Sequence, residues 1–175
     1  MRTIPCYDQH VHRSWLALIF LLPACSKGSK PAPAADPDGW QCFARDPAEP
    51  DLPQGNVQYV RQRLIAGRIE TDSVFVQGGA GGATRLVLKP VGDHLEATLR
   101  GQTVTARLLV ADGSHWTLSY RDTSRGLVFD EDSMLADGVL TVTSIDPGDK
   151  GPTKTAVRYL PVSCDVVVAE LARYP

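Results

Sequence analysis

Short runs of alternating apolar and polar residues fill the chain from Arg68 onward, separated by Gly, Pro, Asp and Ser. In one of them, Leu95, Ala97 and Leu99 fall on one face of the predicted strand and polar side chains on the other. Runs that recur roughly every 8–12 residues are typical of a β-sandwich or barrel. Their connections are too short for parallel crossovers. We therefore predict an all-β fold, an antiparallel meander of about eight to ten strands that forms a small barrel or sandwich.

Most of the expected strands follow directly from the alternation, and the pattern resembles that of lipocalin-like and other small up-and-down barrels. Residues 56–66 fit a helix or a twisted strand, and we favour a strand because everything after them reads as β. Residues 78–82 are expected to form a glycine-rich hairpin loop. The expected strands are 40–43, 71–77, 84–89, 94–100, 104–110 (with Val104, Ala106, Leu108 and Val110 inward), 115–121, 127–129, 139–145, 155–162 and 164–171.

An unbroken apolar run from Trp15 to Leu22 stands apart from this pattern. It is too short to span a bilayer, which takes about 20 apolar residues. Arg2 and Arg13 precede the run, and small residues follow it. A basic start, a short apolar centre and a small-residue exit are the parts of a secretory signal.

The exit of this run, Leu22-Pro23-Ala24-Cys25, resembles the lipobox of bacterial lipoproteins. The resemblance implies that Cys25 is lipidated and that residues 1–24 are a cleaved signal peptide. A triacylated cysteine suits stable anchoring, because a single acyl chain holds a protein only marginally. Ser26 after the cysteine implies outer-membrane sorting in the same family. The rival interpretation is an ordinary cleaved signal in which Cys25 has no role.

Residues 25–38 are expected to be the lipidated cysteine and a flexible linker, because they are rich in Pro, Ala, Gly and Ser without apolar periodicity. Residues 39–175 then form a single β domain. Removing residues 1–24 takes Arg2, Arg13 and Asp8 from the 18 basic and 20 acidic residues, which leaves 16 and 19, a net charge of −3. A weakly acidic chain without a basic block argues against a nucleic-acid partner.

Cleavage before Cys25 would leave Cys42 and Cys164 as the remaining pair, since Cys6 lies in the signal. In the oxidising compartment that export implies, we predict that these two form a disulfide. Two free thiols or half of a metal site are the alternatives. No metal site or cofactor is expected, because His94 and His115 show no zinc-ligand spacing.

Candidate chemistry in the β domain is sparse. Ser114 and His115 are neighbours on a predicted strand and would point to opposite faces, which rules out a nucleophile–base pair there. The acidic run 130–132 could hold calcium but lacks calcium-loop spacing. Trp40, Trp116 and Tyr120 are possible contacts for a ligand or partner, or else they fill the core of a small barrel.

These observations favour a lipid-anchored cell-envelope protein whose β domain is a non-enzymatic binding or structural module. The resemblance implies that it lies in the outer membrane. Its expected partners are the membrane, through the anchor, and an envelope protein or a small apolar ligand. The alternative is a lipocalin-like carrier of a small apolar ligand. A weaker alternative is an envelope enzyme whose site the periodicity does not reveal.

Overall fold

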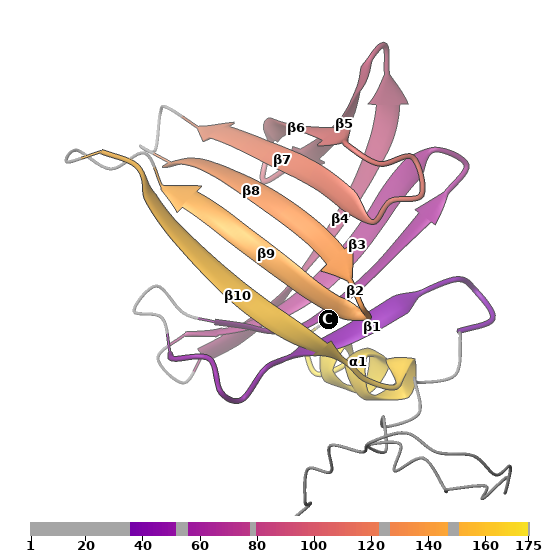
Figure 1. The fold of residues 1–175 in the computed structure, drawn as a ribbon, viewed down its shortest axis with the longest axis vertical. Helices are drawn as coiled ribbons and strands as arrows, with labels where there is room; N and C mark the ends of the chain where they lie inside the picture. The colour runs from indigo at the N-terminus through magenta and orange to yellow at the C-terminus, as the bar shows by residue number, and fades with distance from the viewer. Residues whose placement is uncertain (1–35, 52–55, 78–79, 123–126, 147–150, 175) are drawn as a thin grey trace, which may run out of the picture. The chain divides into compact units, whose positions relative to one another are not determined.

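The computed structural model describes residues 36–51, 56–77, 80–122, 127–146 and 151–174. Residues 1–35, with the expected signal and the lipidated Cys25, lie outside the described residues, and so do Gly78 and Gly79. The described residues form one closed antiparallel barrel, in which each strand pairs with its neighbours in sequence and the first strand pairs with the last (Figure 1). The predicted all-β meander is confirmed, as a barrel.

The barrel has ten strands followed by one short helix. They are β1 (Gln41–Arg45), β2 (Asn56–Ile65), β3 (Arg68–Gln77), β4 (Ala80–Val91), β5 (His94–Leu99), β6 (Gln102–Leu108), β7 (His115–Asp122), β8 (Leu127–Ala136), β9 (Val139–Asp146), β10 (Thr153–Pro161) and α1 (Cys164–Leu171).

The strands turn where the sequence supplies residues that tolerate positive φ. Asp137 and Gly138 join β8 to β9 with φ of 52° and 74°. Two consecutive positive φ angles are what a two-residue hairpin turn requires, and Asp-Gly is a preferred pair for it. Between β6 and β7 the connection is longer, so the expected inward Val110 lies in the loop and is 42% exposed.

Several predicted boundaries are corrected. Residues 56–65 form a strand, as favoured. The strand expected at 127–129 runs on to Ala136 and carries the acidic run. Gly81 and Gly82 belong to β4 and not to a loop. Gly82 is needed there because a Cβ would lie 2.5 Å from the ring of Phe75.

The segment 164–171, expected as a strand, is the helix α1. It contacts the outer faces of β1, β2 and β3. Val167 on the helix is 0% exposed, and Val74 on the outer face of β3 is 1% exposed. The helix therefore covers apolar surface outside the barrel. A strand was predicted here because the helix contains several valines, whose branched side chains favour strands.

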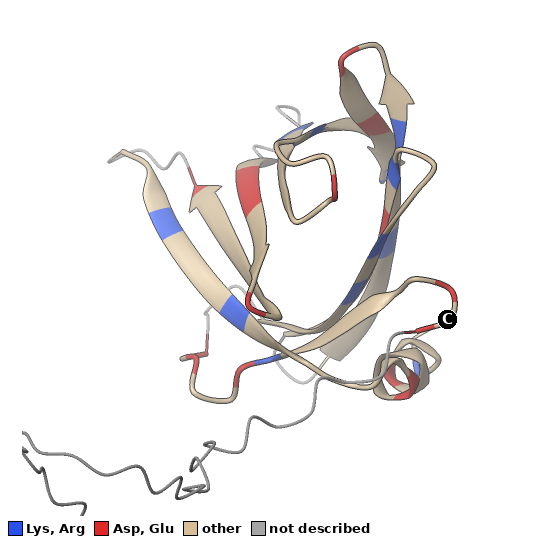
Figure 2. Ribbon diagram, turned by 45° about the vertical axis from the view of Figure 1, so that its right-hand side comes forward, with Lys and Arg blue, Asp and Glu red and all other residues tan. Residues whose placement is uncertain are grey.

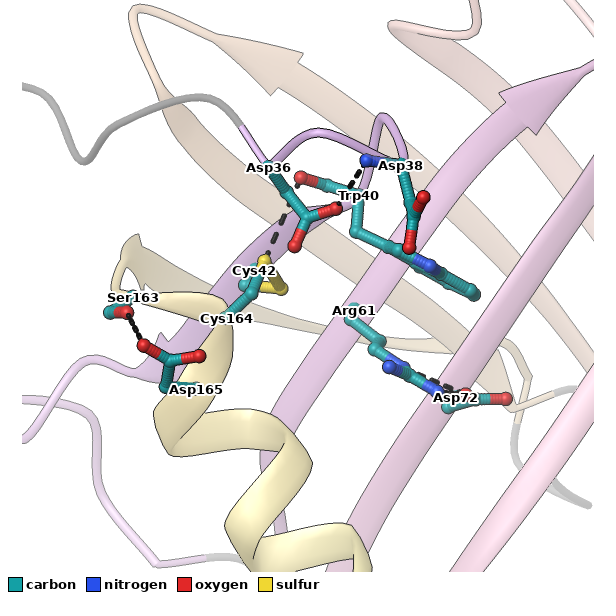
Figure 3. Close-up of a disulfide and its surroundings, with 9 residues drawn as sticks. All are labelled: Asp36, Asp38, Trp40, Cys42, Arg61, Asp72, Ser163, Cys164 and Asp165. Carbon is teal, nitrogen blue, oxygen red and sulfur yellow. Dashed lines mark hydrogen bonds and ion pairs between the residues drawn. A yellow bond between two sulfur atoms is a disulfide. The ribbon is translucent and has the colours of Figure 1, made fainter.

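A disulfide between Cys42 on β1 and Cys164 at the start of α1 confirms the predicted pairing (Figure 3). It closes a loop with a sequence separation of 122 residues. The disulfide lies on the outer face of the barrel, where α1 contacts β1. The disulfide thus fixes the C-terminal helix to the first strand.

Replacing both Cys42 and Cys164 by serine should lower the free energy of unfolding by about 2–5 kcal/mol, because a cross-link over a long loop restricts the unfolded chain. Urea denaturation followed by circular dichroism would measure this. Dithiothreitol should destabilise the wild type by a similar amount and leave the double variant unchanged. Equal stability of the two proteins would show that the disulfide contributes nothing.

Candidate functional site in the barrel interior

Two apolar clusters fill much of the barrel interior. The larger one includes Trp116, Leu118 and Tyr120 of β7, and Leu108 packs against it. The smaller one includes Phe43, Leu140 and Tyr159. Trp116 and Tyr120 are 5% and 2% exposed, so these two expected ligand contacts are core residues.

Polar side chains line the rest of the interior. Cross-strand pairing joins Ser73 of β3 to Thr84 of β4, and Glu131 of β8 to Ser144 of β9. Thr155 of β10 pairs with Ser144 and extends the second row. All five side chains point into the barrel, because along each pleated strand they alternate with residues whose side chains point outward. In the order of the closed sheet, β3 lies opposite β8 and β4 opposite β9, so the two polar rows face each other.

Solvent reaches this polar part of the interior. Ser73, Thr84, Glu131, Ser144 and Thr155 are all half-buried although they face inward. An eight-stranded barrel is just wide enough for side chains to fill, and barrel diameter grows with the number of strands. A barrel of ten strands can enclose more room than small Ser and Thr side chains fill, which agrees with the partial exposure of these inward residues.

Glu131 is an acidic side chain within this lumen. Its register partner on β7 is Leu118 of the larger cluster, and two residues away on the same face Phe129 stacks on Tyr120 with 5.1 Å between ring centroids. Burial among the barrel atoms raises the pKa of the Glu131 carboxyl above its ordinary value. Glu131 is half-buried as a residue, and its carboxyl points inward and is strongly desolvated.

The acidic run at 130–132 does not act as one cluster, although it forms a continuous red band on β8 in Figure 2. Asp130 accepts hydrogen bonds from Ser119 (2.6 Å) and Arg121 on the outer face. Asp132 lies 2.8 Å from Nε2 of His115. Glu131 alone points inward, so the sequence run carries two surface acids and one interior acid. Sequence reasoning missed Glu131 because three consecutive acids resemble a solvated turn.

Tyr159 of the smaller cluster feels the charges of both Glu131 and Arg45. Burial raises the pKa of the Tyr159 hydroxyl, and the charge of Glu131 raises it further, while Arg45 lowers it. The Arg45 side chain is 7% exposed and forms an ion pair with Asp51 at 3.3 Å. It also donates to the carbonyl oxygen of Pro50. Arg45 is therefore engaged by the segment that follows β1.

Trp40, the third expected contact, lies outside the barrel (Figure 3). Its ring packs against the guanidinium groups of Arg61 and Arg63, with 4.3 and 4.4 Å from each Cζ to the ring centroid. Such cation–π contacts hold the segment 36–40 against β2. Arg63 also donates to the carbonyl oxygen of Asp38 (3.2 Å), so the end of the expected linker is fixed to the barrel.

The same arginines pair with buried acids on the outer face. Arg63 donates to Glu70 at 2.6 and 2.8 Å, and Arg61 Nε donates to Asp72 at 2.8 Å. The hydrogen bond from Arg63 holds the pKa of the Glu70 carboxyl below its usual range. Oδ1 of Asp72 is buried without a hydrogen bond, although Nε of Arg85 lies 3.7 Å from it. These ion pairs carry a structural role.

Two hollows lie near Trp40 and the first strand. One, of about 150 Å³, is bordered by Gln62, Asp112 and Trp116. The other, of about 350 Å³, is lined mainly by apolar residues beside the disulfide, among them Trp40 and Leu135. Volumes of ~300–1,000 Å³ are typical of small-molecule sites. The larger hollow reaches that range, and it is bordered both by Trp40 outside the barrel and by Phe43 and Leu135 of the smaller interior cluster.

His94 and His115, the histidines of the described residues, lie on the outer face. Nε2 of His94 is 2.7 Å from Glu96, and this hydrogen bond, followed by the one to Asp93, raises the pKa of the imidazole. The ring of His115 is engaged by Asp132 on the neighbouring strand. Across the described ranges, no three His, Cys, Asp or Glu side chains gather as a metal-binding group.

Comparison with known proteins finds no matching family model, no matching curated protein and no matching solved structure. No helix in the described part of the chain is long and apolar enough to cross a bilayer. The fold and the lumen therefore rest on the chain's own geometry.

Replacing Glu70 by glutamine should destabilise the domain at pH 7 by about 1–3 kcal/mol, because the hydrogen bonds of Arg63 to a carboxylate are lost. The pKa of Glu70 is lower in the folded protein than in the unfolded chain, where it is near 4.5. The carboxylate therefore stabilises the fold fully above pH 4.5, and this stabilisation is lost as the pH falls through the lowered pKa of the folded protein. Urea denaturation from pH 7 to 3 should show the gap between wild type and variant closing with acid. The half-exposed Glu96, replaced in the same way, is the control and should change stability little.

Replacing Glu131 by glutamine should have the opposite effect and raise stability at pH 7 by about 1 kcal/mol. The folded pKa is raised, so the carboxyl destabilises the fold once pH rises above the unfolded value near 4.5, and the penalty grows until the folded pKa is passed. Wild type and variant should therefore be equally stable in acid and diverge towards neutral pH. A variant less stable than wild type at pH 7 would mean that Glu131 has a stabilising partner.

Proposed function

We propose that this chain is a lipid-anchored protein of the outer membrane of a bacterial cell envelope, whose closed barrel is a non-enzymatic binding module. The anchor rests on the lipobox-like residues 22–25 and the apolar run before them. The binding role rests on one observation above all, the half-buried polar side chains that face the interior of a closed barrel.

The position of the linker supports the anchored arrangement. The segment 36–40 is fixed to the barrel beside the disulfide, so residues 25–35 would connect Cys25 to this point. A chain of that length spans at most about 40 Å. An anchored domain would then remain close to the lipid surface while its β1–β2 side stays rigidly attached to the tether.

The packing also bears on the alternative, a carrier of a small apolar ligand. Trp116 and Tyr120 are packed in the larger cluster, and the accessible part of the lumen carries Ser, Thr and Glu side chains. An amphipathic ligand fits this lining better than a purely apolar one, because a buried polar group without a partner is costly.

The intact mass of the protein extracted from membranes tests the anchor. We expect residues 25–175 plus three acyl chains for the wild type. Replacing Cys25 by alanine should abolish the modification, because no other thiol can take its place. The matched control, Cys6→Ala, should leave the mature mass unchanged. An unmodified wild-type chain, or one that begins elsewhere, would refute the anchor.

A further inference from the structure

We propose that the barrel lumen binds a small organic cation, an amine with an apolar body, whose ammonium group meets the carboxylate of Glu131. This inference rests on the proposed binding function and names the class of ligand. Its geometric basis is the inward register of Glu131 between Leu118 and Ser144.

The charge balance of the lumen favours a positively charged ligand. Within the described strands, Arg45 is the one basic residue at an inward position. Asp51 and the carbonyl of Pro50 engage its two terminal nitrogens, and its Nε is buried without a partner. Burial alone accounts for the raised pKa of Glu131, which indicates that no charged group among the described residues pairs with it. A carboxylate in a low-dielectric site is unfavourable without a counter-charge, and such residues gather at functional sites.

The surroundings of Glu131 match the rest of such a ligand. Phe129, two residues away on the same face, is half-buried and stacked on Tyr120, so part of its surface remains open to the lumen. An aromatic face attracts a cation and also packs against an apolar body. Ser144 and Thr155 on the neighbouring strands offer hydroxyl groups to the remaining ammonium hydrogens.

The packing also limits how deep the ligand can reach. On the other side of Glu131 along β8, Ser133 is 3% exposed and pairs with the buried Trp116, so this layer of the interior is filled. The ligand would therefore lie on the Phe129 side of this layer, with its ammonium group at Glu131. A metal ion fits less well, because a single carboxylate does not make a cation site with several oxygen ligands.

Calorimetry on the full mature protein in detergent tests the site, with 2-phenylethylammonium as the probe and 2-phenylethanol as its uncharged counterpart. The wild type should bind the ammonium about tenfold to a hundredfold more tightly than the alcohol, since a charge-assisted contact is added. Glu131→Gln should abolish that preference. Glu96→Gln, the same change outside the barrel, should retain it.

Glu131→Asp keeps the charge on a shorter side chain and should bind the ammonium with intermediate affinity, which guards against loss of binding through misfolding of the glutamine variant. Equal ammonium affinity in wild type and Glu131→Gln would overturn the proposal, and so would a wild type that does not bind the ammonium. The mass of the chain reports the anchor independently, so an unlipidated Cys25 with intact ammonium binding would refute the anchor alone.

Discussion

Pairing between the first and the last strand is the constraint on which the rest of this structure depends. β1 lies between β2 and β10, and its pairs run from Phe43 with Pro161 to Arg45 with Tyr159. Without this contact the sheet would expose two edges of unpaired backbone groups. The contact is made by a strand of five residues, and the disulfide and the segment around Trp40 reinforce it from outside. The disulfide and the cation–π contacts of Trp40 thus support closure of the barrel in addition to the backbone hydrogen bonds.

The number of strands then determines what the interior can contain. The two apolar clusters do not fill the interior of the ten-stranded barrel, and small polar side chains and Glu131 occupy the rest of its inward positions. Glu70 and Glu131 illustrate the result with the same side chain. Arginines on the outer face pair with Glu70, whereas Glu131 has no counter-charge among the residues that the structure describes. A fold selected only for stability would have no use for the second arrangement.

The sequence predicted the all-β fold, most strands and the disulfide, because alternation with period two is a local signal and the cysteines left few pairings. It failed where local and tertiary preferences compete. Residues 164–171 carry three valines that favour a strand, yet they form a helix because the barrel is already closed and its outer face needs cover.

The sequence named Trp40, Trp116 and Tyr120 as possible contacts for a ligand or partner. It could not tell which of them would lie inside the barrel and which outside. Extending the alternation from Phe129 through Glu131 to Ser133 would have placed Glu131 inward. The two neighbouring acids concealed that signal, since a charged run usually indicates solvent. Ligand class depends on which strands face each other across the lumen, and this comes only from closure.

The attachment at Cys42 also decides how the domain would respond to mechanical load. Tension applied along the linker first meets the stacked Trp40, and a few residues later the covalent bond from Cys42 to Cys164. Beyond that bond the force passes directly into α1 and the end of β10, so β1 cannot be peeled from the sheet residue by residue. If the proposed anchor holds the chain at Cys25, a pull on the linker would therefore leave the shape of the barrel interior unchanged.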